Sequence, residues 1–281
     1  MARKRILILG NMAKSGLAEQ IEALRPWFEQ RVEIVDVMSS RDAVSERARS
    51  ADLCVVFGGD GTLLAAARLL AAADVPLLGV NMGKLGFLAE FNVEHMQKHF
   101  DDILAGKVAP TERMMLNVCV SECSKHSFSS PAANDVAISA GQPFRMIDLN
   151  VARGGYQIAR YLGDGVVIST PTGSTGYNMS AGGPIMEPTL DAVAITPIAP
   201  HSLSMRPIVA RSDQPIRITA TRVNPGTSLI VDGQVSSGLC DGDTVEVSRA
   251  AYPSRIIPHP GRSFFGTLSN KLQWGQSPHH V

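Results

Sequence analysis

The sequence predicts an α/β domain with a mainly parallel sheet at residues 1–110 and an all-β domain at residues 111–251. Up to about residue 110, short apolar runs alternate with segments of helical periodicity, and repeated strand–helix–strand units form parallel sheets. From Met114 onward the segments are short, rich in Val, Ile and Thr, and separated by Gly, Pro and Asn, which is typical of antiparallel sheets. The remaining tail, residues 252–281, is expected to pack back on the α/β domain.

The elements of the α/β domain follow from the spacing of its apolar residues. Continuous apolar runs predict strands that are buried on both faces, and apolar residues three or four positions apart predict amphipathic helices. The strands are expected at Arg5–Gly10, Val32–Val37, Leu53–Phe57 and Pro76–Val80, and the helices at Leu17–Gln30, Leu63–Ala73 and Glu94–Leu104. Open sheets of this kind bind ligands beyond the carboxyl ends of their strands.

The second domain is expected to consist of short strands, and the tail to be irregular from Tyr252. The strands are expected at Asn117–Glu122, Asp135–Ser139, Ile147–Arg153, Val166–Ser169, Ile216–Ala220, Ser228–Val231 and Thr244–Ser248. Phe264, Phe265, Leu268, Leu272 and Trp274 provide the tail with apolar anchors for docking.

Composition excludes several classes of protein. Among 281 residues, 26 Lys and Arg balance 26 Asp and Glu, so the basic excess of a general nucleic-acid binder is missing. No apolar run is long enough for a membrane span or a signal peptide, which predicts a soluble cytoplasmic protein without membrane or nucleic-acid partners. Cys119, Cys123 and His126 resemble metal-ligand spacing, but no fourth ligand is nearby, so a structural zinc is disfavoured.

The first chemical signal is the sequence Gly58-Gly59-Asp60-Gly61-Thr62, between an expected strand and an expected helix. Glycines there let the backbone approach a ligand closely, and the N-terminus of the following helix favours phosphate. A carboxylate within a phosphate cradle is unusual for binding alone. Asp60 is therefore a candidate for accepting a proton from an attacking hydroxyl or for holding a metal on the phosphates. The structural alternative is a sharp turn in which Asp60 caps the helix.

The second signal is Gly163–Ile185, where two glycine-dense loops flank a short strand. Seven hydrogen-bonding side chains fall within its eleven residues 170–180. A structural turn does not require so many, whereas a surface that binds ribose hydroxyls, phosphates and a base edge does. A Ser/Thr-rich surface loop is the alternative interpretation.

On these motifs the chain resembles the NAD kinases, which share a superfamily with diacylglycerol kinases and 6-phosphofructokinases. The resemblance covers almost the whole chain. It includes Gly58–Thr62, Asn81–Leu88, Asn134-Asp135, Gly163–Ile185, Pro200–Val209, Val231–Gln234 and Lys271–Gly275. The first motif is shared with lipid kinases, and the block Thr170–Tyr177 followed by Ser180–Ile185 is highly specific.

The resemblance implies phosphorylation of the 2′-hydroxyl of the adenosine ribose of NAD to make NADP, with ATP or polyphosphate as donor and Mg²⁺ or another divalent cation accompanying the donor. It implies that Asp60 is the base and that the amides of Gly58, Gly59, Gly61 and Thr62 hold the donor phosphates. A homodimer or homotetramer is also implied.

The same resemblance implies a set of NAD-binding residues. Besides Asp60 and Gly61 it comprises Phe87 with its neighbour Leu88, Asn134, Asp135, Asp164, Thr172, Thr175, Gly176, Tyr177, Asp232 and Gln234. The family usually has Glu where Asp135 stands and commonly has Ala where Gly176 stands, so the shorter acid has less reach and the loop less rigidity.

Two other functions remain open at this point. A lipid or sugar kinase would share Gly58–Thr62, although the polar block at Thr170–Ser180 favours a nucleotide acceptor. A dinucleotide-binding sensor without catalytic activity would keep that block but would have no need of Asp60.

Overall fold

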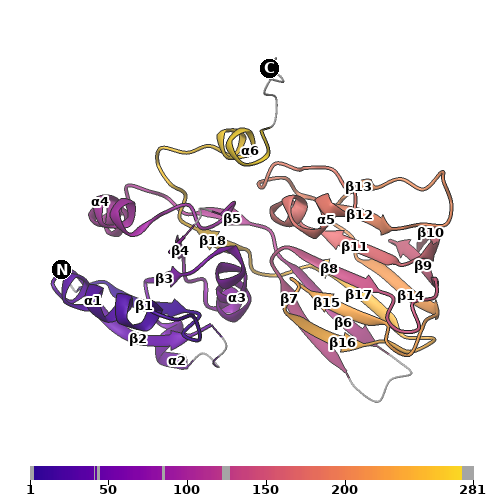
Figure 1. Cartoon of the computed structure of the whole chain (residues 1–281), viewed down its shortest axis with the longest axis horizontal. Coiled ribbons are helices and arrows are strands. Elements are labelled where there is room, and N and C mark those ends of the chain that lie inside the picture. The colour runs from indigo at the N-terminus through magenta and orange to yellow at the C-terminus, as the bar shows by residue number, and fades with distance from the viewer. Residues whose placement is uncertain (1–2, 41, 43–44, 84–85, 122–126, 274–281) are drawn as a thin grey trace. The chain divides into compact units, whose positions relative to one another are not determined.

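The computed structural model describes residues 3–40, 42, 45–83, 86–121 and 127–273. The chain divides into two compact units (Figure 1). The first comprises the described residues up to Ala66, Val75–Thr111 and the described residues from Arg255 onward, and the second comprises Ala67–Asp74 and Glu112–Ser254.

The first unit is built on a six-stranded sheet of order β2-β1-β3-β4-β18-β5. The neighbours β2-β1, β1-β3, β3-β4 and β4-β18 are parallel. In chain order the elements are β1 (Arg5–Gly10), α1 (Leu17–Glu29), β2 (Glu33–Ser39), α2 (Glu46–Arg49), β3 (Leu53–Phe57), α3 (Asp60–Leu70), β4 (Leu77–Val80), α4 (Val93–Leu104), β5 (Thr111–Arg113), β18 (Ser254–Ile256) and α6 (Phe264–Leu272).

Helices cover both faces of this sheet because strand side chains alternate between the faces. Ile8 of β1 and Phe57 of β3 share a buried core with Phe28 of α1 and Phe100 of α4. Gly79 of β4 lies on the other face, where Leu63 of α3 occupies the space that a side chain at residue 79 would take. The α/β class with a mainly parallel sheet is thereby confirmed.

The second unit contains two antiparallel six-stranded sheets, of order β10-β9-β14-β17-β6-β7 and β13-β12-β11-β8-β15-β16. Their strands are β6 (Leu116–Ser121), β7 (Phe128–Ala132), β8 (Asp135–Ser139), β9 (Ile147–Arg153), β10 (Tyr156–Gly163), β11 (Gly165–Ser169), β12 (Ala192–Ile198), β13 (Ile208–Arg211), β14 (Ile216–Arg222), β15 (Ser228–Val231), β16 (Val235–Gly238) and β17 (Thr244–Arg249). A short α5 (Tyr177–Ser180) lies between β11 and β12.

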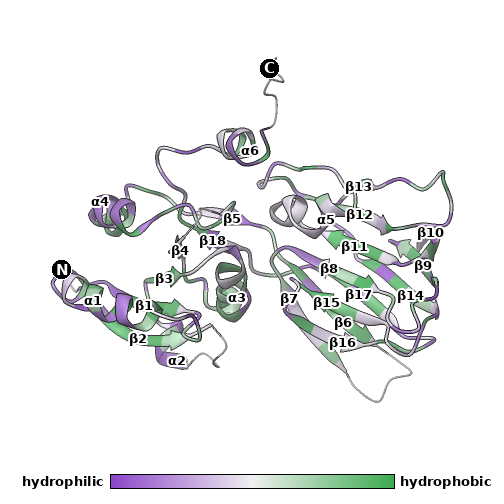
Figure 2. Cartoon of the chain, viewed as in Figure 1, coloured by the Kyte–Doolittle hydropathy of each residue, from purple (hydrophilic) through white to green (hydrophobic). Residues whose placement is uncertain are grey.

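Apolar side chains of both sheets form one buried core, as expected for a β-sandwich. Leu149 of β9 and Ile218 of β14 belong to it together with Ile138 of β8 and Ile168 of β11. Figure 2 shows the resulting alternation of apolar and polar residues along the strands. The all-β class predicted for this part of the chain is confirmed.

Two expectations about local structure were wrong. Helix α3 begins at Asp60 and not at Leu63, because the amides of Thr62 and Leu63 already donate to the carbonyl of Gly59 at 3.0 and 3.2 Å. The tail is also not irregular: it forms β18 and α6. Ser263 caps α6 by accepting a hydrogen bond from the amide of Gly266 at 3.1 Å, which is a common helix start.

Some expectations concern residues outside the described part. Cys123, His126 and Trp274 are among them. Cys119 is described, and its sulfur lies 3.4 Å from Nδ2 of Asn117. Within the described ranges, no helix has both the length and the apolar character needed to cross a bilayer.

Candidate active site

The glycine loop after β3 turns tightly into α3. Gly58 has a φ of +157°, and a Cβ at this residue would overlap the side chain of Thr62. Its amide donates to the carbonyl of Val80 at 2.9 Å, which fixes the loop beside β4. Only glycine fits here, and the N-terminus of α3 with its partial positive charge follows directly.

The Asp60 carboxylate is held by three consecutive backbone amides. Its Oδ2 accepts from the amide of Phe87 at 2.7 Å, and its Oδ1 accepts from the amides of Leu88 and Ala89 at 3.0 Å each. A Cβ on Gly86 would overlap this carboxylate, so the approach depends on glycine. A carboxylate offers about four acceptor positions, so Oδ2 keeps room for one more donor. Asp60 therefore binds the segment that follows β4 and does not simply cap its own helix.

A second carboxylate, Asp232, is held in a similar way in the second unit. Its Oδ1 accepts from the amides of Asn134 and Asp135 at 2.7 and 3.1 Å, and its Oδ2 accepts from the amide of Ala133 at 3.0 Å. Oδ2 also accepts from Nη1 of Arg68 at 2.7 Å, with the Asp232 side chain fully buried and that of Arg68 10% exposed. With four donors on two oxygens, Asp232 positions the backbone of residues 133–135.

Arg68 also holds Gln234. Its Nη2 donates to Oε1 of Gln234 at 2.6 Å. The resemblance named Asp232 and Gln234 as NAD-binding residues, and in this structure both side chains are engaged with the Arg68 guanidinium. Sequence reasoning missed Arg68, although a lone arginine within a Leu- and Ala-rich helix was a usable signal.

Asp135 lies beside Asp232 with only 5% of its surface exposed. Burial, followed by the negative charge of Asp232, raises the pKa of Asp135 from 3.8 to about 7. This side chain can therefore donate or accept a hydrogen bond near neutral pH.

Several other residues of the predicted NAD site gather around Asp135. A Cβ on Gly176 would lie 3.5 Å from Nδ2 of Asn134 and 3.7 Å from Oδ2 of Asp135. Burial and the charges of Asp135 and Asp164 raise the pKa of Tyr177, whose side chain is partly exposed. The second unit thus brings Asn134, Asp135, Asp164, Gly176 and Tyr177 into one cluster.

The polar block that follows β11 divides into two groups. One group serves the fold: the Thr170 hydroxyl donates to the carbonyl of Ala133 at 2.7 Å, and Asn178 accepts from the Thr196 hydroxyl at 2.6 Å. Ser174 is also internal, since its hydroxyl donates to the carbonyl of Pro171 at 2.7 Å. Part of the hydrogen-bonding capacity noted in the sequence is therefore structural.

The other group has free hydrogen-bonding capacity, and so does Asn134, which lies outside the block. Oγ1 of Thr172 and Oδ1 of Asn134 are both buried, and no described residue provides either with a hydrogen-bond partner. Buried polar atoms normally have partners, so these two are candidates for contact with a polar ligand. Thr175 is half-buried and follows Thr172 in the same short 3₁₀ turn.

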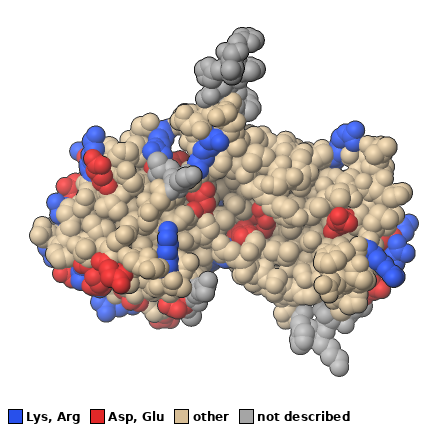
Figure 3. All heavy atoms as spheres, in the orientation of Figure 1, with Lys and Arg blue, Asp and Glu red and all other residues tan. Residues whose placement is uncertain are grey.

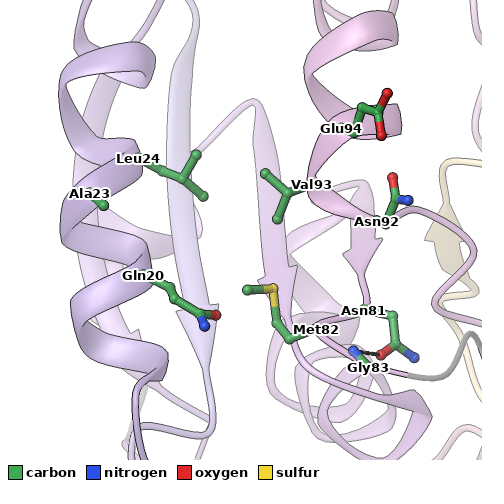
Figure 4. A pocket seen from close by; sticks show the side chains of 9 residues that line it. All are labelled: Gln20, Ala23, Leu24, Asn81, Met82, Gly83, Asn92, Val93 and Glu94. Carbon is green, nitrogen blue, oxygen red and sulfur yellow. Dashed lines mark hydrogen bonds between the residues drawn. The ribbon is translucent and has the colours of Figure 1, made fainter.

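The first unit also has a cavity of about 500 Å³ beside the 81–83 segment. Figure 4 shows Leu24 of α1 and Val93 of α4 facing each other across it, with Met82 nearby and Gln20 and Glu94 among the polar residues. The described lining contains one acidic residue, Glu94, and no basic residue, so it lacks the cations that a phosphate site normally supplies.

The face of the molecule in Figure 3 shows no wide basic field among its described residues. On the face in Figure 3, acidic and basic side chains of the described residues are interspersed, and much of the visible surface is uncharged. In the described ranges, no group of three or more His, Cys, Asp and Glu residues is placed to hold a metal ion.

Comparison with known proteins gives a consistent family. The ATP-NAD kinase N-terminal domain matches residues 11–108, and the ATP-NAD kinase C-terminal domain matches residues 133–259. The NAD kinase of Geobacter sulfurreducens is 43% identical over 226 residues, 80% of each chain. The NAD kinase of Syntrophobacter fumaroxidans is 36% identical over 282 residues, covering 98% of this chain and 100% of that one.

Solved structures agree with this. An NAD kinase from Archaeoglobus fulgidus in complex with ATP has a TM-score of 0.77 at 27% identity, covering 96% of this chain and 98% of that one. Yeast NADH kinase complexed with NADH has the same fold, with a TM-score of 0.87 at 23% identity over 100% of this chain and 91% of that one. The matched domains and the full-length relatives together show that this chain belongs to the NAD kinase family.

Proposed function

We propose that this protein transfers a phosphoryl group to the 2′-hydroxyl of the adenosine ribose of NAD, with Asp60 as the proton acceptor. The observation that carries the proposal is the Asp60 carboxylate, which stands at the N-terminus of α3 directly after a glycine loop and retains an acceptor position on Oδ2. Family membership supports the same reaction.

The reaction joins the ribose oxygen to the terminal phosphorus of the donor. The bond between that phosphorus and the bridging oxygen breaks, which releases ADP or a polyphosphate shortened by one unit. The hydroxyl proton goes to Oδ2 of Asp60. A carboxylate is a weak base, but in a loose transition state it needs only to orient the hydroxyl and to accept its proton late.

The donor is proposed to be ATP or polyphosphate, held by the amides of Gly58, Gly59, Gly61 and Thr62 at the start of α3. Mg²⁺ or another divalent cation neutralises charge on the phosphates when it is bound. With three amides on Asp60, the oxygen donors best suited to Mg²⁺ are the phosphates themselves and water, so the cation is proposed to arrive with the donor.

NAD is proposed to bind the cluster of the second unit. Oδ1 of Asn134 and Oγ1 of Thr172 would gain the partners that the described residues do not supply. Asp135 would bind ribose hydroxyls, and Tyr177 would pack against a base. Thr175, Gly176 and Asp164 would complete this surface, and Asp232 and Gln234 would support it through their hydrogen bonds with Arg68. Phe87 and Leu88, which the resemblance also assigns to NAD, are the apolar candidates of the first unit.

A homodimer or homotetramer is proposed as the assembly. Strand β13 is an edge of its sheet, and Val209 on it is 52% exposed. Leu203 in the preceding loop is 91% exposed. Apolar side chains along an open edge favour burial against another chain.

The test is a coupled assay in which purified protein, Mg²⁺, NAD and either ATP or polyphosphate are incubated and NADP is detected with an NADP-specific dehydrogenase. Wild-type protein is expected to make NADP. Asp60→Asn is expected to lower turnover by about 10²- to 10⁴-fold, the usual contribution of a general base, while NAD binding is largely kept.

Because Asp60 also accepts three amide hydrogen bonds, the base role needs a second readout. That readout is the split between the two kinetic constants: Asp60→Asn should lower kcat while the KM for NAD stays near that of the wild type. Near-normal turnover of Asp60→Asn would contradict the role of Asp60. NAD binding by folded wild-type protein without NADP formation from either donor would favour the sensor.

A further inference from the structure

A basic cavity lies between α6 and the segment that follows β4, apart from the glycine loop itself. It has a volume of about 630 Å³, and its lining includes Gly86, Arg262, Ser263, Thr267, Asn270 and Lys271. Two of these side chains are cationic and three are neutral hydrogen-bonding groups. No Asp or Glu occurs among the described residues of the lining.

The two cations keep their hydrogen-bond donors available for a ligand. Neither Arg262 nor Lys271 forms an ion pair with a described residue. The Lys271 ammonium lies 5.1 Å from the centroid of the Phe87 ring, a cation–π contact that leaves its hydrogen-bond donors available. Two unpaired cations beside hydroxyl and amide groups form a site suited to a polyanion.

The loop that carries Arg262 is shaped before any ligand binds. His259, which is 9% exposed, donates its backbone amide to Oε2 of Glu90 at 2.8 Å, and its ring Nδ1 accepts from the amide of Gly261 at 3.0 Å. The Arg262 amide donates to the carbonyl of His259 at 3.1 Å.

The same ring joins this loop to α4. Since Nδ1 of His259 accepts a hydrogen bond, the neutral tautomer carries its proton on Nε2, which lies 3.1 Å from Nδ1 of His95. Burial, and then the neighbouring charges of Arg262, His95 and His99, lower the pKa of His259 and keep this tautomer neutral. Arg262 therefore belongs to a turn whose backbone is held by hydrogen bonds to His259.

Two residues connect the cavity to the segment whose amides hold the Asp60 carboxylate. Gly86 belongs to its lining, and a side chain at Gly86 would reach the Asp60 carboxylate. Phe87 donates its amide to that carboxylate at 2.7 Å and receives Lys271 on its ring. Lys271 thus contacts Phe87, the residue whose amide holds the carboxylate of the proposed proton acceptor.

We propose that Arg262 and Lys271 bind the non-transferred phosphates of the phosphoryl donor, so that the C-terminal segment is part of the donor site. This inference rests on the proposed function and deepens it. The ligand chemistry is a linear chain of phosphates, which a nucleoside triphosphate and inorganic polyphosphate share. Polyphosphate depends on these contacts more than ATP does, because ATP also has an adenosine group to hold it.

The experiment compares Arg262→Gln, Lys271→Met and the double variant with the wild type. Lys98→Met on the exposed face of α4 is the matched control for the loss of one positive charge. The donor is varied at saturating NAD, once as ATP and once as polyphosphate, and NAD is then varied at saturating donor. Binding of tripolyphosphate with Mg²⁺ is measured separately by calorimetry, and thermal melting checks folding.

Each single variant is expected to raise the KM for the donor by about tenfold, the range for one charge-assisted hydrogen bond, and the double variant by more. The KM for NAD should stay within about twofold, and the control should resemble the wild type. The effect should be larger with polyphosphate than with ATP, and the double variant should bind tripolyphosphate more weakly.

The remaining outcomes separate the two proposals. An active wild type whose variants keep the donor KM would overturn the donor site and leave the proposed function standing. A rise in the KM for NAD alone would also overturn it. Wild-type protein that makes no NADP, but binds tripolyphosphate through Arg262 and Lys271, would support the anion site and contradict the proposed function.

Discussion

Asp60 in the first unit and Asp232 in the second accept the same pattern of backbone hydrogen bonds, but they differ in burial and in ion pairing. Each carboxylate accepts hydrogen bonds from three consecutive amides, 87–89 for Asp60 and 133–135 for Asp232. Asp232 is fully buried and paired with Arg68, whereas Asp60 is half-buried and forms no ion pair with a described residue.

The difference separates a positioning carboxylate from one that can react. A guanidinium and three amides occupy the acceptor positions of Asp232, so this carboxylate holds the backbone of residues 133–135 and has little room for a further donor. Asp60 keeps an open position on Oδ2 and a partial exposure to ligands. Hydrogen bonds from three backbone amides thus fix a loop at both carboxylates. Asp232 is also paired with Arg68, whereas Asp60 has no such ion pair with a described residue, so its second oxygen stays accessible to a ligand.

The largest expected effect comes from breaking the Asp232 pair. Asp232→Asn leaves the Arg68 guanidinium buried beside a neutral amide, which should lower the free energy of unfolding by about 3–5 kcal/mol. Urea denaturation followed by circular dichroism measures this change. The double variant Arg68→Met, Asp232→Asn should lose less than the sum of the two single variants, because no charge is then stranded.

An exposed pair provides the control. Arg217→Gln removes the 2.8 Å contact with Glu246 on the surface of the second unit, and it should cost less than about 1 kcal/mol. If Asp232→Asn proved as mild as Arg217→Gln, the positioning role of Asp232 would be wrong.

The next variant keeps the Asp60 carboxylate but disturbs the segment whose amides hold it. The methyl group of Gly86→Ala would overlap Asp60, so the carboxylate must move. A small misplacement of a catalytic group can lower turnover by about 10²-fold, and we expect a loss of this order with little change in melting temperature. The coupled NADP assay measures it. Gly238→Ala, which meets no atom within 4 Å, is the control.

This variant tests the comparison directly. Full activity of Gly86→Ala would show that Asp60 tolerates displacement and would remove the distinction between a reactive and a merely positioning carboxylate.

The parts of the fold that sequence reasoning predicted well are those fixed by neighbouring residues. The bounds of β1, β3, β8, β9 and β15 match the expected ranges, because an apolar run between turn residues is a local signal. The tail was harder, since β18 consists of three residues that pair with β4, a strand far away in the sequence.

The site shows the same division. The glycine loop and the polar block were visible as motifs, and the resemblance to NAD kinases supplied their roles. The contacts that give each carboxylate its character were not visible, because Asp60 reaches Phe87 across 27 positions and Arg68 reaches Asp232 across 164. Motif spacing identifies candidate site residues, but only tertiary contacts show which carboxylate oxygens are free to accept a hydrogen bond from a ligand.

The third prediction concerns Asp135, the carboxyl group beside the ion pair of Asp232 and Arg68. The pKa of Asp135 is raised to about 7, so the folded state holds a proton that the unfolded state releases above about pH 4. The contribution of Asp135 to the stability of the wild type should therefore fall as the pH rises from about 4 to 7 and remain level above that. Asp135→Asn removes this loss, so its melting temperature relative to wild type should increase over the same interval.

A carboxylate with the opposite shift is the control. The hydrogen bond and charge of Arg160 lower the pKa of Asp148, so Asp148→Asn should be less stable than wild type by a constant amount between pH 5 and 8. Melting curves of all three proteins from pH 4 to 9 decide the matter. A flat difference for Asp135→Asn would mean that Asp135 is ionised in the folded protein.

The smallest effect is expected at Gly176 of the second unit, where an added methyl group would meet no atom closer than 3.2 Å, in contrast to Gly86 of the first unit. Gly176 has φ −94° and ψ −131°, which lies outside the regions that other residues favour, and a Cβ there would meet the carbonyl of Gly173 at 3.2 Å. The backbone strain and the close contact should together outweigh the entropy gain of about 0.4–1 kcal/mol, so Gly176→Ala is expected to be slightly less stable than the wild type. The KM for NAD should change by less than about threefold, since the methyl would lie beside Asn134 and Asp135 at ordinary contact distances. A large rise in this KM would show that Gly176 tolerates an added methyl group no better than Gly86 does. Steric crowding would then not distinguish the two regions.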